Sequence, residues 1–212
     1  MQRIFHTPEG VRDIYSQECS RKQKLQEKLH RVFHQYGFED IETPTFEYFE
    51  VFSKEVGTIP SRELYKFFDR EGNTLVLRPD FTPSVSRACA TYFNPEKEVV
   101  SLCYTGNTFI NNSSFRGRLK ETTQMGVERM GDDSPEADAE ILAMTVECLL
   151  ATGLTEFQVS VGQVDYYKAI FAQTGMSQEE EEELRELISQ KNYFGVEELV
   201  KNKNMDKSLA RV

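Results

Sequence analysis

Four polar side chains in two separate stretches of the sequence are suited to binding a positively charged amino group. Asp80 and Thr82 belong to the stretch LRPDFT, and Gln124 and Glu128 belong to QMGVE. Two carboxylates, a hydroxyl and an amide carbonyl all accept hydrogen bonds, whereas an α-ammonium group offers three donors and one positive charge. The residue types therefore favour an ammonium pocket, although their spacing alone does not require the four side chains to meet.

The second pair of candidates lies on the return strand of a predicted hairpin. The stretch LCYTG indicates a first, buried strand, and residues 121–130 indicate the second. Gln124 and Glu128 are an even number of residues apart, so both side chains point to one face of the sheet. The polar, basic connection between the strands is longer than a structural hairpin needs and lacks an Asn-Gly or Asp-Gly tip. We therefore expect a hairpin that faces a ligand.

The first pair of candidates surrounds the predicted start of a helix. A short apolar strand leads into Asp80, after which Thr82 and Pro83 suit the N-cap and first position of the helix. Capping by Thr82 and a favourable interaction of Asp80 with the helix dipole are the structural alternatives to ligand binding. The sequence leaves both alternatives open.

Further elements follow from periodicity and from helix start and stop signals. The pattern predicts an amphipathic helix at 14–36, a hairpin at 65–78, a helix from Ser134 to Gly153, a half-buried strand at 157–161, and helices from Val164 onward.

Two histidines on the first predicted helix raise the question of a metal site. His30 and His34 are four residues apart and therefore share one helix face. Because the sequence shows no third ligand, we interpret them as a solvated flank of the helix and predict no metal.

The composition excludes some classes of protein. None of the apolar runs among the 212 residues approaches the ~20 needed to span a membrane. The formal charge of −10 disfavours non-specific nucleic-acid binding. The four cysteines have no CxxC spacing, and no signal peptide is visible, so we expect a cytoplasmic protein with reduced thiols.

Several multi-residue blocks resemble the histidyl-tRNA synthetase family. These blocks are TPEGVRD, YGFEDIETPTFE, ELYKFFDREGNTLVLRPDFT and YTGNTFI…GRLKETTQMGVERMG, which cover most of residues 7–131. The resemblance implies an α+β, class II aminoacyl-tRNA synthetase-like fold, in which helices flank an antiparallel sheet. We expect this core at residues 1–175 and a helical segment at 176–212, with the intact protein continuing beyond Val212.

The resemblance also implies a role for the four candidates. In that family the residues at these four positions hold the amino group of histidine. Thr82, Gln124 and Glu128 are the same residue types as in the family, whereas Asp80 stands where the family has Glu.

One part of the family pattern is missing. The synthetases carry an Arg-x-Glu signature directly after the residue that matches Phe109, and this Arg contacts the α-phosphate of ATP. Here Ile110 and Asn112 occupy the two positions. Losing such a contact costs several kcal/mol, comparable to the roughly 2.7–4 kcal/mol of one oxyanion donor. We therefore predict that the chain cannot form histidyl-adenylate.

A chain that keeps the amino-acid pocket without the ATP contact resembles the regulatory subunits of ATP phosphoribosyltransferase. That resemblance implies a non-catalytic subunit that activates a catalytic subunit in histidine biosynthesis and binds histidine for feedback inhibition. It also implies that the chain uses no cofactor and binds no tRNA. It also implies a short-form catalytic subunit as partner and a homodimer, paired around Ile41–Pro44, within a hetero-oligomer. The alternatives are an active histidine–tRNA ligase and a binding module for another amino acid.

Overall fold

The computed structural model describes residues 6–53, 59–112 and 117–202. Two compact units make up the chain, Met1–Phe157 and Gln158–Val212. The domain boundary expected after residue 175 falls inside the second unit, between helices α5 (Val164–Thr174) and α6 (Gln178–Ser189).

The first unit is built around a long antiparallel hairpin. Strand β5 (Val100–Phe109) pairs with β6 (Glu121–Met130) along their whole length. The short strand β1 (Glu39–Asp40) adds to the other edge of β5 in parallel orientation. This arrangement confirms the predicted hairpin and extends its first strand beyond the LCYTG stretch.

A second, smaller sheet contains the predicted hairpin of residues 65–78. Its strand order is β2 (Phe46–Tyr48), β4 (Thr74–Leu77) and β3 (Lys66–Phe68), and all pairs are antiparallel. The β3–β4 turn is closed by Asp69, whose carboxylate accepts hydrogen bonds from two backbone N–H groups of the turn. Gly72 supplies the positive φ of +88° that this turn requires.

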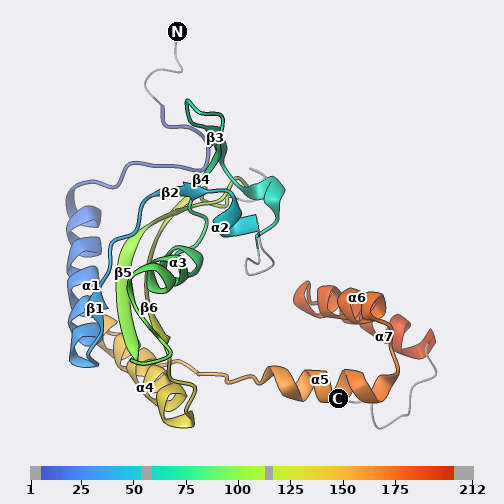
Figure 1. Cartoon of the computed structure of the whole chain (residues 1–212). Coiled ribbons are helices and arrows are strands. Elements are labelled where there is room, and N and C mark those ends of the chain that lie inside the picture. The colour runs from blue at the N-terminus through green and yellow to red at the C-terminus, as the bar shows by residue number, and fades with distance from the viewer. Residues whose placement is uncertain (1–5, 54–58, 113–116, 203–212) are drawn as a thin grey trace. The chain divides into compact units, whose positions relative to one another are not determined.

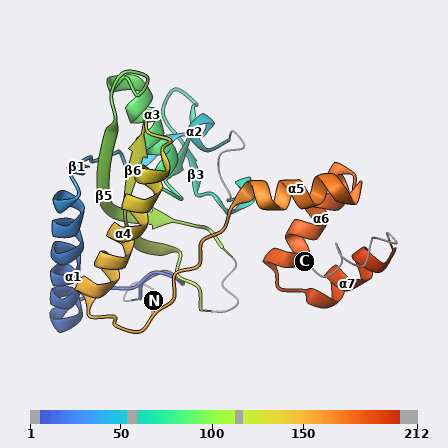
Figure 2. The same ribbon diagram turned by 90° about the horizontal axis from the view of Figure 1, so that it is seen from below.

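Helices cover both faces of the β5–β6 hairpin (Figure 1). Helix α3 (Thr82–Tyr92) packs on one face, and α1 (Ser16–Gln35) and α4 (Pro135–Thr152) pack on the other, as the view from below also shows (Figure 2). The buried side chains on the α3 face are Phe81, Val85, Cys89, Val100, Leu102 and Tyr104. The buried side chains on the α1–α4 face are Val32, Phe33, Phe38, Cys103 and Met144.

The ends of α4 follow the sequence signals. Ser134 caps the helix by accepting a hydrogen bond from the backbone N–H of Ala137 at 3.2 Å. Gly153 ends it in the left-handed conformation, with φ of +95°. A short helix α2 (Glu50–Ser53) and a 3-10 turn (Ser61–Glu63) complete the described elements of this unit.

The regular elements in the described part of the second unit, residues 158–202, are all helices. Helix α6 begins with the predicted capping box of Ser177 and Glu180, and α7 spans Tyr193–Asn202. The half-buried strand predicted at residues 157–161 is wrong, because no strand in the described ranges pairs with this segment. Alternation of apolar residues cannot by itself supply a hydrogen-bonding partner. Across the described ranges, no helix is long and apolar enough to cross a membrane.

Candidate functional site

The four candidate side chains meet on the α3 face of the hairpin. The hydroxyl of Thr82 donates a hydrogen bond to Oε1 of Glu128 at 2.6 Å. The amide of Gln124 donates to Oδ1 of Asp80 at 3.4 Å. All four side chains are half-buried, so a small ligand could reach them. The structure therefore brings together residues that the sequence places in two separate stretches.

The strand register explains how the two stretches meet. Gln124 pairs with Gly106, and Glu128 pairs with Leu102, so both face α3 together with Leu102 of the apolar cluster. The start of α3 packs over this face and brings Thr82 above the strand. The predicted N-cap role of Thr82 is wrong, because Phe81 occupies that position and Thr82 is the first helical residue. Its hydroxyl contacts Glu128 instead of a backbone N–H.

A fifth side chain, Tyr104, belongs to the same cluster. Its hydroxyl donates to Oε1 of Glu128 at 3.4 Å and accepts from the amide of Gln124 at 3.5 Å. The ring stacks on Phe81 with centroids 4.3 Å apart. Gly126 lies directly opposite, and a Cβ atom there would be 2.4 Å from the Tyr104 hydroxyl. The glycine therefore provides the room that the phenol occupies between Gln124 and Glu128 of β6.

Arg78 packs against Phe81 beside this cluster and forms no ion pair with the carboxylates of Asp80 and Glu128. Its guanidinium lies 4.0 Å from the centroid of the Phe81 ring and donates to the backbone oxygens of Thr43, at 2.8 Å, and Asn107, at 2.9 Å. Burial lowers the pKa of Arg78 below its ordinary value. Because these contacts hold the cation against the ring and the two carbonyls, Arg78 is a structural anchor for the loop that carries Asp80.

The electrostatics of the cluster favour a positively charged ligand. Burial, followed by the nearby charge of Asp80, raises the pKa of Glu128, while the Thr82 hydroxyl opposes the shift. Within residues 6–53, 59–112 and 117–202, no Lys, Arg or His forms an ion pair with Asp80 or Glu128. A bound ammonium group would supply the missing positive charge and three hydrogen-bond donors.

The three residues directly after β5, Ile110, Asn111 and Asn112, have uncharged side chains. The backbone N–H of Ile110 donates to the carbonyl of Lys120 at 2.9 Å. The side-chain amide of Asn112 donates to the carbonyl of Leu119 at 3.3 Å. The aliphatic side chain of Ile110 and the neutral amide of Asn112 therefore lie just beyond the end of β5.

Comparison with known proteins identifies the family of this chain. The model of the family described as histidyl-tRNA synthetase matches residues 10–212. The chain belongs to the histidyl-tRNA synthetase family. This family membership agrees with the resemblance of the sequence blocks.

Curated relatives within this broad family carry a different name. A protein of Acetivibrio thermocellus named ATP phosphoribosyltransferase regulatory subunit is 43% identical over 95% of this chain and 48% of its own length. A protein of the same name from Ruminiclostridium cellulolyticum is 40% identical over 98% of this chain and 50% of its own length. The chain thus spans about half the length of the curated relatives that it matches.

A solved structure confirms the expected fold. The crystal structure of a protein described as an ATP phosphoribosyltransferase regulatory subunit/histidyl-tRNA synthetase from Bacillus halodurans C superposes with a TM-score of 0.86 at 32% identity. The match covers 98% of this chain and 54% of that protein. The fold is therefore α+β and class II synthetase-like, as the sequence blocks implied.

Proposed function

We propose that this chain is the synthetase-like part of a regulatory subunit of ATP phosphoribosyltransferase. In this role it binds histidine without activating it and acts on a separate, short-form catalytic subunit. The observation that carries the proposal is the cluster of Asp80, Thr82, Gln124 and Glu128, which has two carboxylates and no cation of its own.

The cluster supports binding of an amino acid through its ammonium group. Glu128 and Asp80 supply the negative charge, while Thr82 and Gln124 add neutral polar groups that can reorient toward a donor. Burial makes the charge of Glu128 unfavourable on its own. A ligand cation relieves this cost, so the electrostatics of the pocket suit an ammonium group.

The end of β5 supports the absence of adenylate chemistry. Ile110 and Asn112 replace the Arg and Glu that the resemblance places after Phe109. Adenylate formation develops negative charge on the α-phosphate, and an Arg fixed on a strand stabilises that charge through two parallel hydrogen bonds. The aliphatic side chain of Ile110 offers no donor for this purpose. A pocket that retains the amino acid but lacks this contact suits a sensor better than a ligase.

The names of the relatives support the regulatory role and the partner. Two relatives at 43% and 40% identity are named as regulatory subunits of ATP phosphoribosyltransferase. A regulatory subunit needs a catalytic subunit on which to act. We expect a short-form catalytic subunit to bind this chain, and a homodimer of the chain to form through the region around Ile41–Pro44. Analytical sedimentation of the isolated chain measures its mass in solution and so tests whether it forms a homodimer.

Calorimetry with matched ligands tests the histidine pocket. Histidine and histamine both keep the ammonium group, whereas imidazolepropionic acid lacks it. We expect histidine to bind, histamine to bind more weakly, and imidazolepropionic acid not to bind. Equal affinities for histidine and imidazolepropionic acid would contradict the assigned role of Asp80 and Glu128. Titration with other amino acids separates a histidine sensor from a pocket for a different amino acid.

Reconstitution tests the regulatory role. A short-form phosphoribosyltransferase is assayed alone, with this chain, and with this chain plus histidine. We expect the chain to co-purify with the transferase and raise its activity, and histidine to lower that activity. A transferase that is equally active without the chain would overturn the regulatory assignment.

An active histidine–tRNA ligase is the second candidate. Three pocket residues, Thr82, Gln124 and Glu128, match the synthetase pattern and favour this candidate. The relative from Bacillus halodurans C carries both descriptions. Histidine-dependent exchange of pyrophosphate into ATP decides between the two. We expect no exchange above background, because the side chain of Ile110 has neither a charge nor a hydrogen-bond donor for the α-phosphate.

A further inference from the structure

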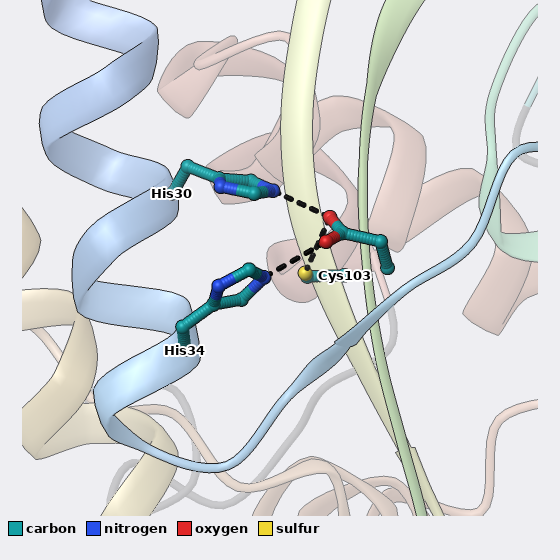
Figure 3. A group of neighbouring side chains, drawn as sticks. His30, His34 and Cys103 are labelled. Carbon is teal, nitrogen blue, oxygen red and sulfur yellow. Dashed lines mark hydrogen bonds and ion pairs between the residues drawn. The ribbon is translucent and has the colours of Figure 1, made fainter.

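A second polar cluster lies on the opposite face of the hairpin, against helix α1 (Figure 3). His30 and His34 extend from successive turns of α1 toward Asp40 of β1, and Nε2 of His34 lies 2.9 Å from its Oδ2. Nε2 of His30 contacts the other carboxylate oxygen of Asp40. The thiol of Cys103 on β5 donates to that same oxygen at 3.5 Å. Four side chains from three elements thus converge on one point.

We propose that His30, His34, Asp40 and Cys103 form a binding site for a single Zn²⁺ ion. Two imidazoles, a carboxylate and a thiolate are the ligand types that zinc uses in four-coordinate sites. The mixture of nitrogen, oxygen and sulfur suits a borderline-soft ion and disfavours Mg²⁺ or Ca²⁺, which prefer oxygen ligands.

The distances allow one ion to reach all four groups. The four ligand atoms lie within 4.8 Å of one another. In a tetrahedral zinc site with bonds of about 2.0–2.3 Å, neighbouring ligand atoms are roughly 3.3–3.8 Å apart. The widest separations must therefore shrink by about 1 Å, and the short contacts of Asp40 to the histidines must open. Both changes require the side chains of His30, His34 and Asp40 to move relative to Cys103.

The charges of the site also match a divalent cation. Neutral imidazoles, one carboxylate and one thiolate carry two negative charges in total, so a bound Zn²⁺ makes the site neutral. Cys103 must lose its proton when the metal binds.

The arrangement gives the ion a route from solvent to a buried sulfur. The side chains of His30, His34 and Asp40 are 39%, 46% and 58% exposed. Cys103, in contrast, is fully buried at the base of the cluster. His34 also lies in the last turn of α1, where the partial negative charge of the helix end favours a cation.

Titration of the reduced chain with Zn²⁺ and with Co²⁺ tests the proposal. Calorimetry should show one Zn²⁺ per chain, and Co²⁺ should produce thiolate-to-metal charge-transfer absorption. We expect His34→Gln and Cys103→Ser each to weaken Zn²⁺ binding at least about 100-fold, since outer partners of metal ligands alone contribute 10–100-fold. The matched controls are His6→Gln, an exposed histidine outside the cluster, and Cys89→Ser, a buried thiol on the other face of the sheet.

Thermal unfolding provides a second measurement that does not depend on the buried cysteine variant folding well. Zn²⁺ should raise the unfolding temperature of the wild type and of His6→Gln, and it should leave that of His34→Gln unchanged. Unaltered Zn²⁺ affinity in His34→Gln, or cobalt absorption without a thiolate band, overturns the proposal and leaves a hydrogen-bonded cluster without metal. The substitution Glu128→Gln should not affect zinc binding, so this site and the histidine pocket can fail independently.

Discussion

Replacing Glu128 by Gln separates the ligand-binding role of the pocket from its contribution to stability. Glutamine keeps the shape of the side chain and an oxygen that can accept the 2.6 Å hydrogen bond from Thr82. The Tyr104 hydroxyl, which donates to the same Glu128 oxygen at 3.4 Å in the wild type, can also donate to the glutamine oxygen. The substitution therefore removes one negative charge and leaves the local contacts available.

The affinity for histidine should fall. A hydrogen bond to a charged group contributes about 1.5–3 kcal/mol, which corresponds to roughly 10- to 150-fold in the dissociation constant. Asp80 remains as the second carboxylate, so binding should weaken within this range and not vanish. Calorimetric titration of histidine into wild type and variant at pH 7 measures the ratio directly.

The free energy of unfolding of the ligand-free protein should rise in Glu128→Gln, although the affinity for histidine falls. Burial and Asp80 raise the pKa of Glu128 above 4.5 in the folded state. Such a carboxyl stabilises the fold below its unfolded-state pKa, and this contribution is lost as the pH rises through the folded-state value. At pH 7 the wild type carries a half-buried charge that the variant lacks. Glu128→Gln should therefore unfold at higher urea concentration at pH 7, and the difference should disappear below about pH 4.5.

Urea unfolding between pH 4 and 8 checks the pH dependence, with Glu96→Gln in an exposed turn as the matched control. The control should change neither histidine affinity nor the pH profile. Wild-type affinity in Glu128→Gln, or a stability difference from the wild type that is the same at every pH, would refute the assignment of Glu128 as a buried charge that awaits an ammonium ligand.

Three further substitutions test the surroundings of the pocket. Gly126→Ala should destabilise the fold by about 1–3 kcal/mol and weaken histidine binding, because its Cβ would be 2.4 Å from the Tyr104 hydroxyl. Gly162→Ala is its control, since nothing lies within 4 Å of a Cβ there, and it should unfold as the wild type does. Phe81→Ala removes a side chain that is 1% exposed and should cost about 3–5 kcal/mol in urea unfolding. Ser134→Ala removes the N-cap of α4 and should cost about 1 kcal/mol in the same assay while leaving histidine affinity unchanged.

Local signals in the sequence predicted much of the first unit. Periodicity located α1 and the two strands of the hairpin, and Ser134 and Gly153 marked both ends of α4. The same signals failed where the outcome depends on a partner. The alternation at residues 157–161 indicated a strand, yet no described strand pairs with it. Local capping rules favoured Thr82 as an N-cap, but its hydroxyl bonds to Glu128 on another element.

The pairing of distant residues explains what the sequence could not show. Tyr104 was missed because its role depends on lying opposite Gly126, which only the strand register reveals. One signal was available, since Tyr104 shares the even spacing of the α3-facing positions of β5. His30 and His34 looked like a pair without a third ligand, because Asp40 and Cys103 are 63 positions apart and meet only after β1 pairs with β5.

Cys103 and Tyr104 are neighbours along β5, yet they belong to clusters on opposite sides of the sheet. A deletion or insertion of one residue early in this strand would exchange the two directions, turning the sulfur toward the carboxylates of one side and the phenol toward the imidazoles of the other. We therefore expect insertions and deletions among relatives of this chain to fall outside β5. An alignment of relatives that shows gaps within this strand would indicate that at least one of the two clusters is dispensable.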